Sequence, residues 1–185
     1  LYVPREWPTF TKAEMSAMKA LSYNELAFRV VRPFVSETFS DYDLQALIAK
    51  AYGSFDGGAV APVTNIGDNI HLMELFHGPT LAFKDVAMQM LGGLFDHVLK
   101  TRGEHITIVG ATSGDTGSAA IEACRDKNTL DIFMLFPEGR VSEVQRRQMT
   151  TVFADNVHNL QVNGTFDDCQ DLVKAMFNDQ AFRDQ

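Results

Sequence analysis

The sequence predicts an α/β fold in which a parallel sheet follows a helical N-terminal region. Three observations support this prediction. Helix-start signals dominate up to residue 58, strand-like and helix-like segments alternate from residue 59 onward, and residues 132–136 are almost wholly apolar. Strict alternation is typical of parallel sheets with right-handed crossovers. A wholly apolar strand is typical of a sheet that is covered on both faces.

The N-terminal region contains three helix starts. Two have the hydroxyl–carboxylate spacing of a capping box, which satisfies the free amides of a first helical turn. These are Thr11 with Glu14 and Ser22 with Glu25, and Ser40 is expected to cap a third helix. Because glycines and a proline punctuate residues 53–62, we predict a helical region over 1–58 and an α/β domain over 59–185.

The α/β domain is predicted to alternate four strands with four helices. Apolar runs indicate the strands, and apolar residues at helical spacing indicate the helices. In order, the elements are a strand at 70–76, a helix at 84–100, a strand at 106–109, a helix at 116–126, a strand at 132–136, a helix capped by Ser142 with Gln145, a strand at 158–162 and a helix started by Thr165 with Asp168.

This topology predicts where a ligand would bind. In a parallel sheet the strand-to-helix loops lie at one edge, and ligands bind at that edge. The four loops cover residues 76–83, 110–115, 137–141 and 163–165, and the first two hold the most unusual residues. Arg140 in the third loop is a weaker candidate for facing an anion, because a surface arginine is the commoner explanation.

Lys84 is the first candidate for chemistry. It lies at a helix start, where the positive end of the helix dipole opposes its charge. Its flanks Leu81, Ala82, Phe83 and Val86 are apolar, which predicts a sheltered amine. A sheltered amine has a lowered pKa, which suits a nucleophile or a Schiff-base former. The alternative to a reactive lysine is an ordinary surface lysine that is exposed to solvent.

The second candidate is the loop of small and hydroxyl residues that opens the helix near residue 116. Glycines let a backbone approach a ligand, and the first amides of a helix attract anions. The loop lacks the glycine spacing of a Walker or dinucleotide motif, so we expect it to bind an anion such as a carboxylate. The loop covers residues 110–118 and includes Thr112, Ser113, Gly114, Asp115 and Thr116. A plain helix cap is the alternative, and the negative charge of Asp115 must then face another group.

The composition of the chain disfavours several classes of protein. The net charge of −8 disfavours nucleic-acid binding, and no apolar run is long enough to span a membrane. The two cysteines, Cys124 and Cys169, are interpreted as reduced core residues of a cytoplasmic protein. No metal site is expected, since neither an HExxH nor a CxxC motif occurs. No feature of the sequence predicts an oligomeric state.

Two motifs together resemble a known family. ELFHGPTLAFKD, which contains Lys84, and GATSGDTGSAAI resemble the threonine synthases of the bacterial and fungal type. These are pyridoxal-phosphate enzymes of the tryptophan-synthase-like fold (fold type II). SYNELAFRVVRPF, FPEGRVSEVQRRQMTT and VNGTFDDCQDLVK agree, so the similarity covers nearly the whole chain.

The resemblance assigns roles to the candidate residues. It implies that Lys84 holds pyridoxal 5'-phosphate as an internal aldimine, that Phe83 belongs to the cofactor site, and that residues 112–116 receive the substrate carboxylate. Asp115 lies where many relatives have an asparagine near the cofactor's 3-hydroxyl, so its role is less certain. The implied reaction converts O-phospho-L-homoserine and water to L-threonine and phosphate. The alternatives are a threonine-synthase-like phospholyase and a non-catalytic binding fragment.

The family pattern also extends beyond this sequence. Its cofactor-phosphate loop, which resembles GNFG, and its pyridine-nitrogen partner do not occur in residues 1–185, and the chain begins at Leu1. We therefore expect an incomplete N-terminal portion that lacks the remainder of the large domain. By itself it should bind the cofactor weakly; sub-micromolar affinity with normal turnover would contradict this expectation.

Overall fold

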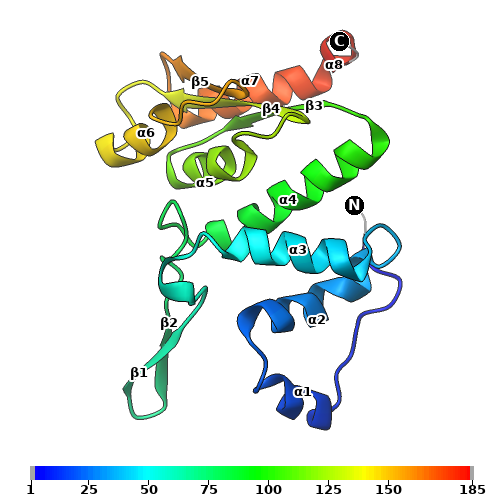
Figure 1. The fold of residues 1–185 in the computed structure, drawn as a ribbon. Coiled ribbons are helices and arrows are strands. Elements are labelled where there is room, and N and C mark those ends of the chain that lie inside the picture. Colours follow the sequence, from blue (N-terminus) through cyan, green and yellow to red (C-terminus); the bar gives the residue numbers. More distant parts are fainter. Residues whose placement is uncertain (1–2, 184–185) are drawn as a thin grey trace.

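The computed structural model describes residues 3–183, which form a helical region followed by a hairpin and a three-layer α/β unit (Figure 1). The elements follow one another along the chain from α1 to α8. They are α1 (Lys12–Met18), α2 (Tyr23–Val35), α3 (Asp41–Tyr52), a short 3₁₀ helix (Asp56–Gly58), β1 (Val63–Gly67), β2 (Ile70–Met73), α4 (Asp85–Arg102), β3 (Ile106–Ala111), α5 (Asp115–Cys124), β4 (Leu130–Pro137), α6 (Glu143–Thr150), β5 (Val157–Val162), α7 (Phe166–Asn178) and α8 (Gln180–Arg183).

The predicted helix starts of the N-terminal region are confirmed. The Thr11 and Ser22 side chains accept hydrogen bonds from the Glu14 and Glu25 amides, and both glutamates complete their capping boxes. The Ser40 side chain accepts from the Asp43 amide at the start of α3. Local hydrogen bonding alone therefore explains where these three helices begin.

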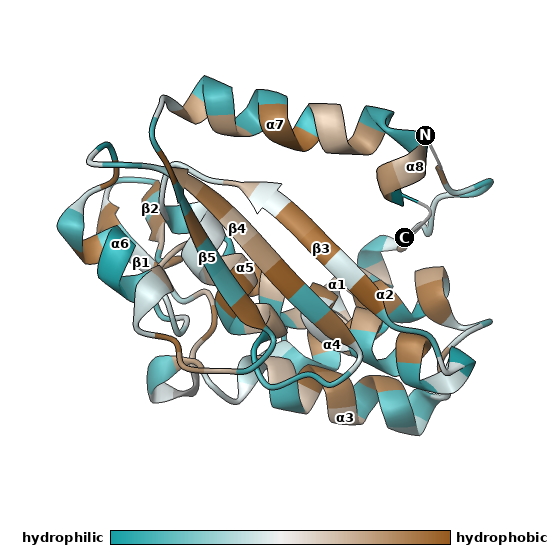
Figure 2. Ribbon diagram, turned by 90° about the horizontal axis from the view of Figure 1, so that it is seen from above, coloured by the Kyte–Doolittle hydropathy of each residue, from teal (hydrophilic) through white to brown (hydrophobic). Residues whose placement is uncertain are grey.

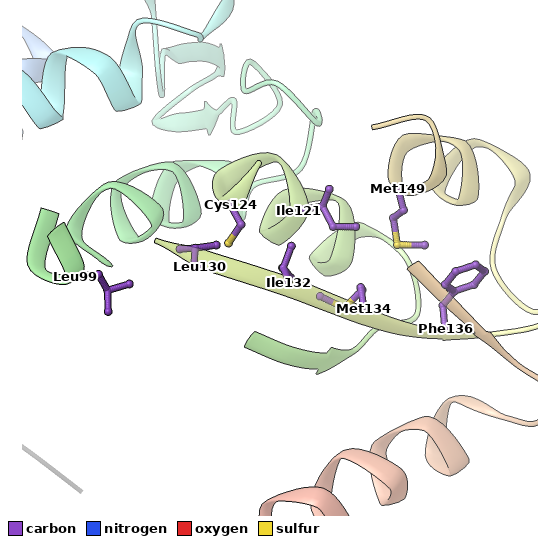
Figure 3. Packing of buried hydrophobic residues seen from close by; sticks show 8 residues of the cluster. All are labelled: Leu99, Ile121, Cys124, Leu130, Ile132, Met134, Phe136 and Met149. Carbon is purple, nitrogen blue, oxygen red and sulfur yellow. The ribbon is translucent and has the colours of Figure 1, made fainter. Parts of the chain in front are cut away.

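The α/β prediction is also confirmed. Strands β3, β4 and β5 form a parallel sheet in that order, and β4 lies in the centre. Figure 2 shows the apolar character of β4 between its two neighbours. Helix α5 packs on one face of β4, and α7 packs against β3 and β4 from the other (Figures 1 and 3). Cover on both faces explains why β4 is apolar along most of its length.

The prediction of a fourth parallel strand at 70–76 is wrong. Residues 70–73 form β2, which pairs antiparallel with β1 in a separate hairpin. Asn69 adopts a left-handed backbone (φ 59°) in the tight turn between the strands. Alternation of apolar and polar residues is the same in both kinds of strand, so it does not distinguish a hairpin from a parallel strand. The 76–83 segment is consequently a hairpin-to-helix loop.

A close contact joins α4 to α5. A Cβ atom on Gly92 would lie 2.3 Å from the Ala123 carbonyl oxygen, so only glycine allows this approach. The Lys84 and Asp115 ends of the two helices also meet, so the helices run in the same direction with their N-termini together. Their packing, rather than a shared sheet edge, brings the loops before α4 and α5 to one place.

A buried core supports both loops. It contains side chains from α4, α5, β4 and α6, drawn as sticks in Figure 3. They are Leu99, Ile121, Cys124, Leu130, Ile132, Met134, Phe136 and Met149. A second cluster, Phe39, Leu44, Ile48 and Met90, joins α3 to α4. Helix α4 therefore belongs to both cores and connects the helical region with the sheet.

Three further observations bear on the expected class of protein. No helix within residues 3–183 is long and apolar enough to cross a lipid bilayer. Among these same residues, no group of three or more histidine, cysteine or acidic side chains is placed to hold a metal ion. Cys124 and Cys169 are both buried free thiols, and burial raises the pKa of each.

Candidate active site

Lys84 and Asp115 form an ion pair that joins the two candidate loops. The Lys84 Nζ atom donates to Asp115 Oδ2 at 2.7 Å. Lys84 occupies the N-cap position of α4, and Asp115 is the first residue of α5. The Lys84 side chain is 24% exposed, so the amine is sheltered but reachable from solvent. The two most unusual segments of the sequence thus converge on one amine.

The ion pair resolves the difficulty that Asp115 poses for an anion site. Its Oδ2 atom faces Lys84, while its Oδ1 atom accepts from the Thr116 amide at 2.9 Å. The hydrogen bond from Lys84 is the largest cause that holds the pKa of Asp115 below its ordinary value of 3.8, against the opposing effect of burial. The carboxylate is thereby committed to Lys84 and to its own helix.

This pairing predicts the acid titration of Asp115. Since its folded-state pKa is lowered, the stabilisation from the pair is present above 3.8 and is lost as the pH falls through the lower folded value. Carbon-detected NMR should give an Asp115 midpoint below 3.8 in the wild-type protein and a higher midpoint in Lys84→Met. Equal midpoints in the two proteins would show that the Lys84 hydrogen bond is not the cause.

Thr112 organises the turn before α5. Its hydroxyl oxygen accepts from the Gly114 amide at 3.0 Å and from the Gly117 amide at 2.9 Å. Its own amide donates to the Leu135 carbonyl oxygen, and the residue is 2% exposed. The Thr112 side chain therefore shapes the backbone of the turn and ties it to β4.

Several donors of this turn have no partner among residues 3–183. They are the amide and hydroxyl of Ser113 and the hydroxyl of Thr116. Gly114 holds the turn in a backbone conformation (φ 144°) that side chains rarely adopt. Free donors at the N-terminus of α5 offer hydrogen bonds to an anion, which is the chemistry expected of this loop.

The apolar shelter expected around Lys84 is only partly present. The Phe83 ring centroid lies 4.3 Å from Lys84 Nζ, close enough for a cation–π contact. However, Leu81 and Phe83 are 62% and 59% exposed, so these flanks do not enclose the amine. Leu81 also has a left-handed backbone (φ 62°). The loop is anchored beneath its surface by Thr80 and Asp85 instead, both of which are buried.

Arg140 lies apart from this ion pair. It is exposed in the turn after β4, and within residues 3–183 no hydrogen bond or ion pair joins its side chain to Lys84 or Asp115. Its charge contributes to the lowered pKa of Asp168, for which the hydrogen bond from the Thr165 amide is the largest cause. The structure brings together residues of the first two loops and leaves Arg140 at the helix cap of α7.

Three site residues had no role in the sequence prediction: Thr80, Asp85 and Gln148. Asp85 accepts hydrogen bonds from the Thr80 amide and hydroxyl, and Gln148 of α6 donates to the Thr80 carbonyl oxygen at 2.9 Å. A threonine in a loop and an aspartate at a helix start are too common to mark Thr80 and Asp85 from the sequence. The Gln148 contact spans 68 residues, and no local pattern marks it.

The sequence matches two family descriptions in succession. Residues 1–52 match the family described as "Threonine synthase N terminus". Residues 60–183 match the family described as "Pyridoxal-phosphate dependent enzyme". The chain belongs to the pyridoxal-phosphate-dependent enzymes. This family segment contains both Lys84 and the loop before α5.

Individual relatives agree with the family match. The chain is 57% identical over 182 residues to a threonine synthase of Pseudomonas aeruginosa. This alignment covers 98% of this chain and 39% of that protein. The solved pyridoxal-phosphate-bound threonine synthase of Brucella melitensis superposes with a TM-score of 0.95 at 53% identity, over 100% of this chain and 40% of that one. The yeast threonine synthase structure gives 0.91 at 44% identity, over 97% and 38%. The chain therefore spans about two fifths of these relatives, with 39% for the first.

The residues present suit a pyridoxal-phosphate group. An aldehyde cofactor needs a reachable amine, and the partly exposed Lys84 Nζ provides one. An amino-acid substrate carries a carboxylate, and the unpartnered donors of Ser113 and Thr116 provide hydrogen bonds for it. Asp115 places a negative charge beside the amine.

Proposed function

We propose that this chain supplies the lysine-bearing part of a threonine synthase, which converts O-phospho-L-homoserine and water to L-threonine and phosphate. The observation that carries the proposal is the 2.7 Å contact between Lys84 Nζ and Asp115 Oδ2, which joins the two family motifs. The threonine synthase relatives, at 57% identity for the first, support this substrate rather than another amino acid.

Each site residue has a distinct part in this proposal. Lys84 binds the cofactor, and the Phe83 ring lies against the same amine. The amide and hydroxyl of Ser113 and the hydroxyl of Thr116 hold the substrate α-carboxylate, and Thr112 shapes their turn. Fixing the carboxylate orients the bonds of the α carbon, which is how positioning lowers a barrier. Asp115 holds the Lys84 amine in place before substrate arrives.

The chemistry requires proton movement at the α, β and γ carbon atoms of the substrate. When bound, pyridoxal phosphate supplies the electron sink for this reaction class. Lys84 Nζ accepts protons from the α and β carbons as phosphate departs from the γ carbon, and it returns protons to the γ and α carbons, while water supplies the hydroxyl group of the β carbon. The buried hydrogen bonds at the start of α4 keep Nζ within one region of the site while these protons move. The shelter of Lys84, at 24% exposure, limits competing proton exchange with water.

Covalent trapping tests the proposed lysine. The complete protein should develop the absorbance of a cofactor–lysine conjugate with pyridoxal phosphate, and borohydride reduction should fix the label on Lys84. Peptide mapping by mass spectrometry identifies the labelled residue. Lys100, an exposed lysine on the same helix, serves as the internal control and should carry no label. Specific label on any other lysine would overturn the assignment.

Product analysis tests the substrate and the reaction. With O-phospho-L-homoserine, the complete protein should release threonine and phosphate in equal amounts. Phosphate without threonine would assign a phospholyase instead. A titration without any spectral change would assign a binding protein that lacks catalysis. These outcomes separate the three functions that the sequence left open.

We also infer a cytoplasmic location. Two buried free thiols, Cys124 and Cys169, suit a reducing compartment, where thiols stay reduced. Biosynthesis of an amino acid from a phosphorylated precursor suits the same compartment. Localisation of a tagged complete protein to an oxidising compartment would contradict this inference.

A further inference from the structure

Asp85 is a fully buried carboxylate directly beside Lys84. It is 0% exposed, and both its oxygens accept hydrogen bonds from one residue. The Thr80 amide donates to Oδ2 at 2.8 Å, and the Thr80 hydroxyl donates to Oδ1 at 2.7 Å. Burying a carboxylate is costly unless hydrogen bonds compensate, so this pair is a fixed feature of the fold.

The surroundings of Asp85 are shaped to accept this carboxylate. It occupies the first turn of α4, where the helix dipole favours a negative charge. A Cβ atom on Gly78 would lie 2.5 Å from Asp85 Oδ2, so the loop passes close only because residue 78 has no side chain. The two hydrogen bonds between Thr80 and Asp85 close a short loop of the chain, and Lys84 is one of the residues within that loop.

Helix α6 extends the network to the second loop. Gln148 donates to the Thr80 carbonyl oxygen at 2.9 Å, which braces the lysine loop from the side. Met149 and Gln145 of the same helix lie against the other loop: ideal Cβ atoms on Gly117 and Gly114 would come within 2.8 Å and 2.5 Å of them. One helix therefore touches both segments whose separation sets the Lys84–Asp115 distance.

We propose that Asp85 and Thr80, braced by Gln148, are positioning residues that hold Lys84 Nζ where it captures the cofactor aldehyde. This inference rests on the proposed function and deepens it. None of the three contacts the reacting atoms. They act through the backbone of residues 80–85, which limits where the four-carbon side chain of Lys84 can reach. A displacement of about 1 Å at a reacting amine costs about 100-fold in rate.

Thr80→Val tests the inference, because valine keeps the shape of threonine and removes only the hydroxyl donor. The chain offers a closely matched control. Thr129 is also 9% exposed, and its hydroxyl donates at 2.8 Å to Asp96, another aspartate of α4. Thr129→Val removes an equivalent bond in the second half of the same helix. Thr80→Ser retains the hydroxyl and is the rescue variant.

The measurement is the rate at which pyridoxal phosphate attaches to Lys84 in the cofactor-free complete protein. Samples are reduced with borohydride at successive times, and the labelled fraction is read by mass spectrometry. Thr80→Val should slow attachment about tenfold or more, while Thr80→Ser and Thr129→Val should stay within about twofold of wild type. Activity should fall through kcat, with the KM for O-phospho-L-homoserine within about twofold of wild type.

Gln148→Ala provides a second variant that keeps the core intact, because Gln148 is only partly buried. It should slow attachment about threefold, and Arg147→Ala on the exposed side of α6 should leave the rate unchanged. If Thr80→Val matches Thr129→Val in attachment rate, the positioning role is wrong, whatever the loss of stability. If wild-type Lys84 captures no label, the proposed function itself has failed.

Discussion

Lys84→Ala is expected to reduce turnover of O-phospho-L-homoserine by about 1,000-fold or more, because it removes both the covalent attachment point and the group that moves protons. The substitution leaves the core untouched, since Lys84 belongs to neither of the two buried clusters. Steady-state kinetics with excess pyridoxal phosphate measures the loss. The borohydride-trapped label on the peptide around residue 84 should vanish in parallel.

Lys84→Arg tests whether residue 84 acts through its positive charge or through the reactivity of its amine. Arginine keeps a cation opposite Asp115, so the ion pair between the two loops survives. A guanidinium stays protonated, so it replaces the amine neither in covalent attachment nor in proton transfer. We expect Lys84→Arg to be as inactive as Lys84→Ala. Recovery of substantial turnover in Lys84→Arg would mean that residue 84 acts only through its charge.

Short-range signals predicted the helix starts well. The capping boxes at Thr11, Ser22 and Thr165 each formed as the spacing required. These contacts join residues that are three positions apart, so they depend on the local sequence and form independently of the tertiary packing around them. The apolar run at residues 132–136 was recognisable for a related reason, because a strand covered on both faces has no polar side to display.

Long-range pairing was harder to predict. The segment at residues 70–73 has the alternation of any half-exposed strand, and the identity of its partner decides between a hairpin and a parallel sheet. The convergence of the two loops was predicted from a shared sheet edge. Its actual cause is the parallel packing of α4 on α5, which depends on the contact of Gly92 with Ala123. A single glycine in a helix does not reveal which neighbour approaches it.

The site chemistry divides in the same way. Lys84 stood out because the helix dipole opposes a lysine at a helix start, and Asp115 stood out because its negative charge conflicts with an anion-binding loop. Thr80 and Asp85 gave no such signal, because a threonine in a loop and an aspartate in a first helical turn are both common. The positioning role proposed for them depends on burial, and burial is a property of the assembled fold.

The core beneath the site provides the second large expected effect. Ile132 of β4 is 0% exposed and belongs to the cluster that joins the sheet to α5 (Figure 3). Ile132→Ala should destabilise this unit by about 2–5 kcal/mol, because it removes buried methyl groups and leaves a cavity that the surrounding strands fill only partly. Amide hydrogen exchange in β4 should then accelerate by about 30-fold or more in the complete protein.

Ile132→Val is the graded control, since it deletes one methylene group and should cost about 0.5–1.5 kcal/mol. Exchange in β4 should accelerate by only about tenfold or less in this variant. The two variants also test how the site depends on its support, because the turn that Thr112 shapes is tied to β4 through the Leu135 carbonyl oxygen. Faster opening of β4 should expose the amides of Gly114 and Gly117 in proportion. Protection of those two amides that stays at the wild-type level in Ile132→Ala would show that the turn is stable independently of the sheet.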